Sequence, residues 1–336
     1  KNLLMKNLVK IKKALISVSD KTNLEKIVSV LLKYKIKIIS SGGTYKKIKK
    51  LNYDCTEISE YTGFHEILNG RVKTLHPKIH AGILSVRDNK KHKKDLLKNN
   101  YDEIDLVIVN FYPFEQILKK KNNSDFIIEN IDIGGPTMVR AAAKNFKDVV
   151  TITNPNNYQN FIDEVNKYKG STSIKFRENS ASYAFNEIAY YDSLISNYFN
   201  NKTKNLFPHK KTLSGVLSEN LRYGENPHQN ASLYKLGNEN SIKQLHGKRL
   251  SFNNYNDIFS ALNVLKQFKK KIATVIVKHS NPCGISINKN NFKSYESALN
   301  CDPRSAFGGV IACNYIIKKK LAKRINKNFF EVIIGN

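Results

Sequence analysis

Short apolar segments alternate with helix-like patterns along the first 150 residues, and this alternation constrains the fold more than any other feature. Strands are predicted over residues 14–18, 36–39, 106–109 and 149–152. Segment 106–109 is almost purely apolar, which is typical of a parallel strand that is buried on both faces. Strands that alternate with helices indicate a parallel sheet with helices on both faces.

The segments between these strands carry helix signals. Apolar residues recur at helical spacing after residue 23, and Thr22 and Glu25 have the spacing of a capping box, so we expect a helix to begin there. A basic helix is predicted after Ser41-Gly42-Gly43-Thr44. Another is predicted from Gly134-Gly135-Pro136 through residues 141–143, with proline at a favoured first-turn position.

The length of 336 residues exceeds that of an average domain, and the pattern predicts two domains. The first spans residues 1–199 and ends in helices, and a polar segment with lysines, asparagines and a proline over residues 200–211 is the predicted linker. A second α/β pattern occupies residues 212–336. Its predicted strands are residues 273–277, 309–312 and 330–334, with a helix around 294–299 and a lysine-rich helix before the last strand.

The net charge of +28 would attract phosphate groups on nucleotides or nucleic acids. The lysines are spread along the whole chain, however, which favours solvated surface lysines over a nucleic-acid interface. The four cysteines form no CxxC pair, so we expect reduced thiols in a cytoplasmic protein and no metal site. No apolar run reaches about 18 residues, so no transmembrane helix and no membrane partner are expected.

Five motifs in the first half place polar chemistry at strand ends or helix starts. Glycines at the start of a helix let backbone N–H groups approach a phosphate, and ligands gather at the carboxyl ends of strands in open α/β sheets. Each motif also has a plain structural interpretation, such as a tight turn, a helix cap or a solvated basic loop, so none is decisive alone. The motifs occupy residues 17–21, 41–44, 71–77, 110–114 and 132–135.

Three motifs in the second half combine polar side chains with turn residues, over residues 221–229, 278–284 and 302–309. A Lys next to a His, as at Lys278-His279, can keep the imidazole neutral and available as a base. The alternative is a strand end with a proline-stopped turn. Phe307 could stack on a flat ligand or fill the core.

In this order the motifs resemble the bifunctional purine-biosynthesis family, in which an IMP cyclohydrolase is joined to an AICAR transformylase. The resemblance covers essentially the whole chain. The segments that carry it are SVSDK, SGGT, GRVKTLHP, NFYPF, IDIGGPTMVRAAAKN, LRYGENPHQ, KHSNPCG and DPRSAFGG.

For the first domain, the resemblance implies a methylglyoxal-synthase-like fold and ring closure of FAICAR to IMP with loss of water and no cofactor. It implies catalytic roles for Lys73, Tyr112, Asp132 and Lys144. It further implies nucleotide and phosphate contacts at Ser17, Ser41, Gly42, Thr44, Arg71, Thr74, Asn110 and Gly134.

For the second domain, the resemblance implies part of a cytidine-deaminase-like fold without zinc. That domain would transfer a formyl group from the cosubstrate 10-formyltetrahydrofolate to the 5-amino group of AICAR. His279 would remove the amine proton, with Lys278 beside it. Substrate contacts are implied for Arg222, Tyr223, Asn253, Phe307, Gly308 and Glu331.

The resemblance also implies a homodimer that acts on small nucleotides and folate. The family's transformylase domain continues beyond the position of Asn336, so we expect little or no transformylase activity if these residues form the whole polypeptide. Arg304 departs from the smaller or apolar residue expected there, with no predicted consequence.

Two other functions remain open from the residues alone. One is a methylglyoxal-synthase-type lyase that releases phosphate from a triose phosphate, although the second domain would have no role in it. The other is a nucleic-acid-binding module, which only the net charge suggests, because aromatic residues are not interleaved with basic patches as in RNA-binding domains.

Overall fold

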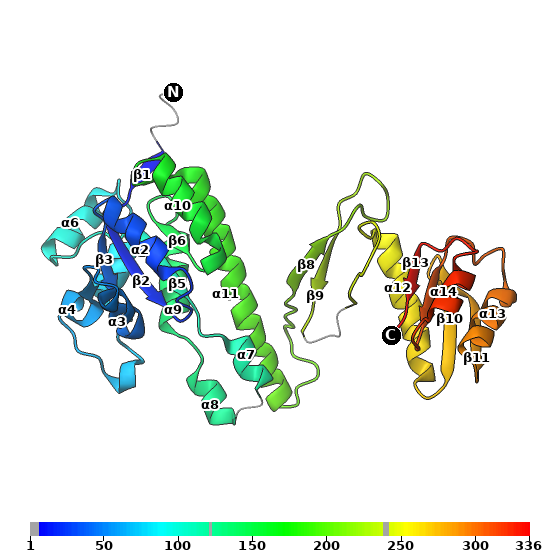
Figure 1. The fold of residues 1–336 in the computed structure, drawn as a ribbon. Coiled ribbons are helices and arrows are strands. Elements are labelled where there is room, and N and C mark those ends of the chain that lie inside the picture. The colour runs from blue at the N-terminus through cyan, green and yellow to red at the C-terminus, as the bar shows by residue number, and fades with distance from the viewer. Residues whose placement is uncertain (1–6, 121–122, 238–241) are drawn as a thin grey trace. The chain divides into compact units, whose positions relative to one another are not determined.

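The structure is a computed structural model that describes residues 7–120, 123–237 and 242–336. The chain forms two compact units, Lys1–Ser214 and Gly215–Asn336, and each is described by itself. Figure 1 labels their helices and strands.

The first unit is built on a five-stranded sheet in the order β4-β3-β2-β5-β6, and every neighbouring pair is parallel. This confirms the predicted parallel sheet. The central strand β2 pairs with β3 and β5, so that Leu15 lies between Ile39 and Val107. The strands are β2 (Lys13–Val18), β3 (Lys37–Ser40), β4 (Thr56–Glu57), β5 (Leu106–Asn110) and β6 (Val150–Ile152).

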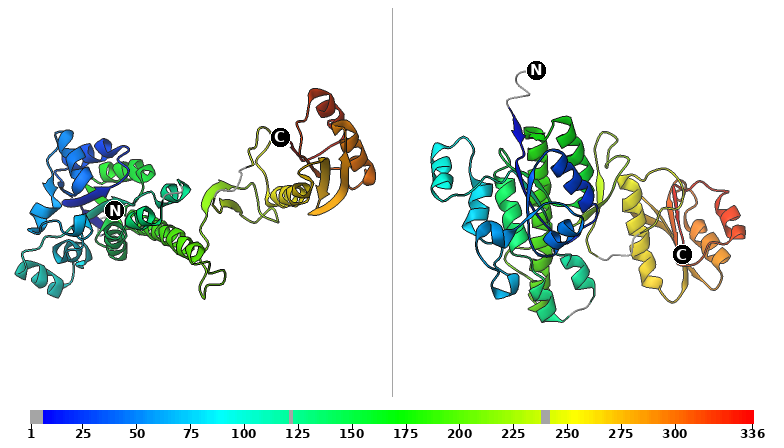
Figure 2. Two further views of the ribbon diagram at one scale, coloured as in Figure 1. Left: turned by 90° about the horizontal axis from the view of Figure 1, so that it is seen from below. Right: turned by 60° about the vertical axis from the view of Figure 1, so that its left-hand side comes forward.

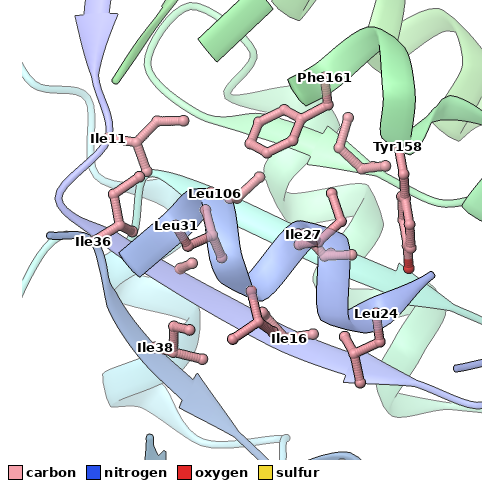
Figure 3. Close-up of a cluster of buried hydrophobic side chains, with 14 of the residues drawn as sticks. Ile11, Ile16, Leu24, Ile27, Leu31, Ile36, Ile38, Leu106, Tyr158 and Phe161 are labelled. Atoms are coloured by element: carbon pink, nitrogen blue, oxygen red, sulfur yellow. The ribbon is translucent and has the colours of Figure 1, made fainter. Parts of the chain in front are cut away.

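Successive side chains of these strands point to opposite faces, and each face has its own core. Ile16 and Ile108 pack under α2 (Leu24–Lys33) and α10 (Tyr158–Lys167), whereas Leu15 and Val107 belong to the cluster on the other face. Figure 3 shows the apolar residues of α2 lying among Ile16, Leu106 and Phe161. The second face is covered by α5 (Pro77–Leu84), α9 (Gly134–Lys144) and α11 (Ile174–Lys202).

The predicted capping box at Thr22 is wrong. Helix α2 begins at Leu24, and Asn23 before it is left-handed with φ 57° and no side-chain cap. The cause is local, because the Asp20 carboxylate accepts the Thr22 N–H at 2.9 Å and also hydrogen-bonds the Thr22 side chain that was expected to cap.

Helix α11 also departs from expectation, because it ends at Lys202 and so occupies the beginning of the predicted linker. The C-terminal end of α11 lies beside α7 (Phe114–Lys119) and α8 (Ser124–Glu129), as Figures 1 and 2 show. There Tyr198 Oη is 3.2 Å from Ser124 Oγ. A short strand β7 (Ser171–Ser173), which the sequence analysis missed, pairs antiparallel with β1 (Leu8–Lys10). The other elements are α3 (Gly42–Lys50), α4 (Ile58–Thr62), η1 (Leu68–Gly70), α6 (Lys90–Lys98), α7 (Phe114–Lys119), α8 (Ser124–Glu129) and η2 (Pro155–Asn157).

The second unit contains a four-stranded mixed sheet in the order β11-β10-β12-β13, in which only β12 and β13 are parallel. This confirms the predicted α/β organisation of the second half. The strands are β10 (Ile272–Lys278), β11 (Asn281–Asn288), β12 (Val310–Cys313) and β13 (Val332–Ile334). The remaining elements are the pair β8 (Val216–Asn220) and β9 (Ser232–Lys235), α12 (Phe252–Leu265), η3 (Lys266–Phe268), α13 (Asn291–Cys301) and α14 (Lys319–Ile325).

The segment after β10 is not the proline-stopped turn considered from the sequence. His279 and Ser280 form a tight turn with φ of 54° and 62°, and the chain returns as β11. Pro282 is tolerated because β11 lies at the edge of the sheet and can leave a hydrogen-bonding position unused.

No helix in the described ranges combines the length and the apolar character that crossing a bilayer requires.

The core under α2 provides a stability test. Ile27 is fully buried, and Ile27→Val is expected to lower the free energy of unfolding by about 0.5–1.5 kcal/mol because it removes one buried methylene. The same substitution at Ile67, which is 46% exposed, is the matched control and is expected to change it by less than about 0.5 kcal/mol. Denaturant titration measures both, and equal effects would contradict the assigned packing.

Candidate active site

A cavity of about 620 Å³ opens at the carboxyl edge of the first sheet. Its walls come from the ends of β2, β3 and β5, from the first turns of α3 and α9, from the end of α8, and from two loops, residues 70–74 and 131–133. Ligand sites of open α/β sheets lie at this edge. The cavity is lined by eleven of the twelve site residues predicted in the first half: Ser17, Ser41, Gly42, Thr44, Arg71, Lys73, Thr74, Asn110, Tyr112, Asp132 and Gly134.

Two hydroxyls and a glycine turn form one wall of the cavity. Ser17 Oγ at the end of β2 lies 3.2 Å from Ser41 Oγ at the end of β3. Helix α3 then starts at Gly42. Its φ of 50° is a left-handed backbone conformation that residues other than glycine rarely adopt. Gly42, Gly43 and Thr44 of the first turn line the cavity, and a helix N-terminus with its unpaired backbone N–H groups suits an anion.

Two of the predicted binding residues hold the backbone of this wall in place. Thr44 Oγ1 both accepts from the Val18 N–H and donates to the Val18 carbonyl, each at 2.9 Å. The Asn110 amide accepts from the N–H groups of Ser19 and Asp20 at 2.7 and 2.9 Å, and it donates to the Asp20 carbonyl at 2.9 Å. These contacts engage both side chains in fixing the loop after β2.

The start of α9 forms the opposite wall and approaches Thr74 closely. A β carbon built on Gly134 would lie 2.2 Å from Thr74 Oγ1, and one on Gly135 would lie 2.6 Å from Asp132 Oδ2. Real β carbons essentially never come this close, so a side chain at either position would force Thr74, Asp132 or the backbone to shift.

Asp132 and Tyr112 are two titratable groups of the cavity whose pKa values are raised. Burial raises the pKa of Asp132, although the Gly135 N–H, which donates to Oδ1 at 2.8 Å, and the charge of Lys73 oppose the rise. Burial and the nearby Asp132 raise the pKa of Tyr112. The Tyr112 backbone also hydrogen-bonds the Asp132 carboxylate, so the two groups are direct neighbours.

Cationic side chains face these groups from loop 70–74. Lys73 Nζ lies 3.2 Å from the position that a β carbon on Gly42 would take and 3.9 Å from Glu66 Oε2. Arg71 forms an ion pair with Glu129, and both side chains are largely exposed. Lys73 is therefore the cation that lies between the glycine turn and Asp132.

The structure places Lys144 away from the other predicted residues. It is exposed at the last position of α9, ten residues after Gly134, which corresponds to about 15 Å along the helix axis. It does not line the cavity, because α9 runs back toward the opposite edge of the sheet. Its catalytic role stays a prediction.

Lys21 is a cavity residue that the sequence analysis quoted within a motif but did not select. Its Nζ donates to the Ser19 carbonyl at 3.3 Å and lies 3.8 Å from the β position of Gly43. It adds a second cation beside the first turn of α3. The available signal was its place as the last residue of the motif SVSDK, shortly after β2 ends at Val18.

In the second unit, several predicted residues meet at the ends of β10, β12 and β13. Lys278 Nζ donates to the Phe307 carbonyl at 2.5 Å, and the Phe307 ring lies 5.5 Å from that of Phe329. Gly308 N–H donates to the Phe329 carbonyl at 2.8 Å. Glu331 accepts from Asn254 at 2.6 Å, which joins this group to the start of α12.

The remaining predicted residues lie around that helix start and the turn before β11. Asn253 donates to the Glu225 carbonyl at 3.2 Å, and the Phe252 N–H donates to the Tyr223 carbonyl at 3.2 Å. The Arg222 guanidinium lies 4.8 Å from the Tyr223 ring centroid. His279 occupies the left-handed turn directly after Lys278.

Within the described ranges, no group of three or more His, Cys, Asp or Glu side chains could hold a metal ion.

Comparisons with known proteins match both halves of the chain. Residues 142–336 match the family described as the AICARFT/IMPCHase bienzyme, and residues 23–137 match the MGS-like domain. The chain is 47% identical over 332 residues to the "Bifunctional purine biosynthesis protein PurH" of Persephonella marina, and 46% identical over 333 residues to the protein of that name from Thermoanaerobacter sp..

These relatives are longer than the chain. Each match covers 96% of this chain and 64% of the relative, so the chain spans 64% of the length of these curated relatives. A solved structure titled "Crystal structure of ForH" is similar with a TM-score of 0.49 and 28% identity, over 56% of this chain and 99% of that one.

Proposed function

Because the chain belongs to the AICARFT/IMPCHase bienzyme family, we propose that its first unit closes the ring of FAICAR to give IMP. We propose further that its second unit carries part of the transformylase that makes FAICAR, so that the chain serves the last two steps of purine synthesis. The observation that carries the ring-closure proposal is the single cavity in which Lys73, Tyr112 and Asp132 face a glycine-lined helix start.

The cavity offers one end for the phosphate of the nucleotide. The first turn of α3 supplies backbone N–H groups, Ser17 and Ser41 supply hydroxyls, and Lys21 supplies positive charge. Together these groups match the charge and the acceptor oxygens of a phosphate. Thr44 and Asn110 contribute by holding this wall in shape.

The part of the cavity lined by Lys73, Tyr112 and Asp132 is the proposed place of ring closure. Ring closure forms a bond between the carboxamide nitrogen and the formyl carbon, and the carboxamide nitrogen loses one proton. The formamide nitrogen then loses its own proton and forms a double bond to the same carbon, as the bond to the formyl oxygen breaks. That oxygen takes up two protons in all and leaves as water. In this proposal Asp132 accepts the carboxamide proton, and Lys73 stabilises the oxyanion that develops on the formyl oxygen. Holding both reacting groups in one cavity supplies much of the rate, because the attack is intramolecular.

The second unit is proposed to bind AICAR and the formyl donor 10-formyltetrahydrofolate. Lys278, Phe307, Gly308 and Glu331 come together at the strand ends, and His279 follows directly after Lys278. His279 is the proposed acceptor of the proton that the AICAR amine loses as it attacks the formyl group. Homodimer formation and a cytoplasmic location are part of the same proposal.

The direct test mixes the purified 336-residue chain with FAICAR and follows IMP formation by ultraviolet absorbance. IMP formation is expected without any added cofactor. A chain that is folded and binds nucleotide but makes no IMP would refute the ring-closure proposal. Release of inorganic phosphate from dihydroxyacetone phosphate would instead favour a methylglyoxal-synthase-type lyase.

The raised pKa of Asp132 predicts the acidic limb of the pH profile. If the ionised carboxylate is the active form, kcat/KM should fall as the pH falls through a pKa above the ordinary value of 3.8. Asp132→Asn is expected to lower kcat/KM by about 10²–10⁴-fold and to remove this limb. Asp125→Asn on the exposed side of α8 is the matched control, and an unchanged limb in Asp132→Asn would contradict the assignment.

A further inference from the structure

Tyr191 is a buried tyrosine of α11 that contacts both loops carrying proposed catalytic groups. It is 5% exposed and does not line the cavity. Its position near the middle of the 29-residue helix α11 fixes it to the core of the first unit, because Ala184 and Ile188 of the same helix pack against the sheet. Any role it has in the reaction must therefore act through its neighbours.

The first contact is with the loop that carries Asp132. This loop is the short connection between α8 and α9, and Tyr191 Oη accepts the backbone N–H of Asp132 at 2.8 Å. The preceding Ile131 packs against the cluster that contains Tyr191. The loop is thus held on one side by Tyr191 and on the other by the bond from Gly135 N–H to Asp132 Oδ1.

The second contact is with the segment that carries Tyr112. The Tyr191 ring lies 5.1 Å from Phe111 and 5.9 Å from Phe114, the residues that flank Tyr112 and Pro113. Aromatic pairs at these separations stabilise the packing beyond the area that they bury. Burial also raises the pKa of Tyr191 to about 12, so its hydroxyl stays neutral at any ordinary assay pH.

We propose that Tyr191 is a positioning residue for ring closure, whose ring anchors the Tyr112 segment and whose hydroxyl anchors Asp132. The inference rests on the proposed function of the cavity. It adds that the distance between Tyr112 and Asp132 is set from α11, behind the cavity wall. Misplacing a reacting group by about 1 Å can lower the reaction rate by about 10²-fold. Tyr191, together with its contacts to Phe111, Phe114 and Asp132, is called the brace below, and it would affect kcat without touching the substrate.

Tyr191→Phe is the test, because it removes the hydroxyl and keeps the ring. It is expected to lower kcat for FAICAR ring closure by about 10- to 100-fold, while the Kd for IMP measured by calorimetry stays within about threefold. The Kd is spared because the proposed phosphate wall lies at β2 and β3.

Tyr198→Phe is the matched control. Tyr198 lies on the same helix, its ring is 6.2 Å from Phe114, and its hydroxyl faces Ser124 outside the cavity. It should leave kcat unchanged. A kcat for Tyr191→Phe within twofold of that for Tyr198→Phe would overturn the brace, whereas a wild-type chain that makes no IMP would overturn the proposed function instead.

A measurement on the wild-type chain covers the case in which Tyr191→Phe does not fold. Amide hydrogen exchange should show the Asp132 N–H protected as strongly as those inside α9, because it donates to a buried hydroxyl. Exchange of the Asp132 N–H at the rate of an unprotected loop would overturn the brace.

Discussion

Replacing Lys73 with alanine is expected to slow ring closure of FAICAR by about 10²–10³-fold. The Lys73 ammonium lies between the Gly42 turn and the Asp132 carboxylate, where the proposal places the developing oxyanion. Removing one preorganised donor from such a site costs about this factor. Steady-state kinetics followed by IMP absorbance measures the loss.

The control for this variant is Lys47→Ala, which removes the same charge from an exposed position on the last turn of α3. Lys47→Ala is expected to change the rate of ring closure by less than about twofold, because the charge of an exposed lysine outside the cavity is screened by salt. If both variants slowed the reaction equally, the effect would come from net charge and not from the site.

Gly134→Ala is expected to cause the second large loss. The new methyl group would lie 2.2 Å from Thr74 Oγ1, so the buried Thr74 side chain, α9 or loop 70–74 must move. Forcing extra volume into a packed contact costs about 1–3 kcal/mol of stability. The displaced loop carries Lys73, so the rate of ring closure should fall by about 10²-fold as well.

The double variant Thr74→Ala/Gly134→Ala separates these two effects. Without Oγ1, the nearest atom of residue 74 is its β carbon at 3.5 Å, which is an ordinary contact. The free energy of unfolding should therefore recover toward that of Thr74→Ala alone, with a coupling energy of about 0.5–3 kcal/mol. Additive losses of stability in the double variant would show that the clash with Thr74 is not the cause.

The sheet of the first unit could be predicted because its strands are buried on both faces, and so appear as apolar runs between helical patterns. The capping box could not be predicted correctly, because Asp20 engages the Thr22 N–H in the folded chain. The hairpin β10–β11 was missed because it reverses at His279 and Ser280 in a left-handed turn without glycine. Such turns carry little sequence signal.

The candidate site could likewise be predicted only in part from the sequence. Motifs at strand ends identified the cavity lining, because a parallel sheet brings its carboxyl ends to one edge. Lys144 was included by resemblance, and only the direction of α9 shows that it lies away from the cavity. Tyr191 was not among the site residues predicted from the sequence. Its bond to Asp132 joins residues 59 positions apart, and no local pattern records such a contact.

The Asn110 side chain holds the loop after β2 without an ionisable group, so substrate binding and ring closure should respond differently to pH. An amide uses donor and acceptor at once, and here it satisfies two N–H groups and one carbonyl without carrying a charge. Thr44 does the same for Val18 with a hydroxyl. The framework of the phosphate wall is thus insensitive to acid, whereas the chemical end contains a carboxylate. Acidification should stop ring closure by protonating Asp132, while the phosphate wall keeps its shape. An inactive, correctly folded complex with unreacted FAICAR could therefore be captured at low pH.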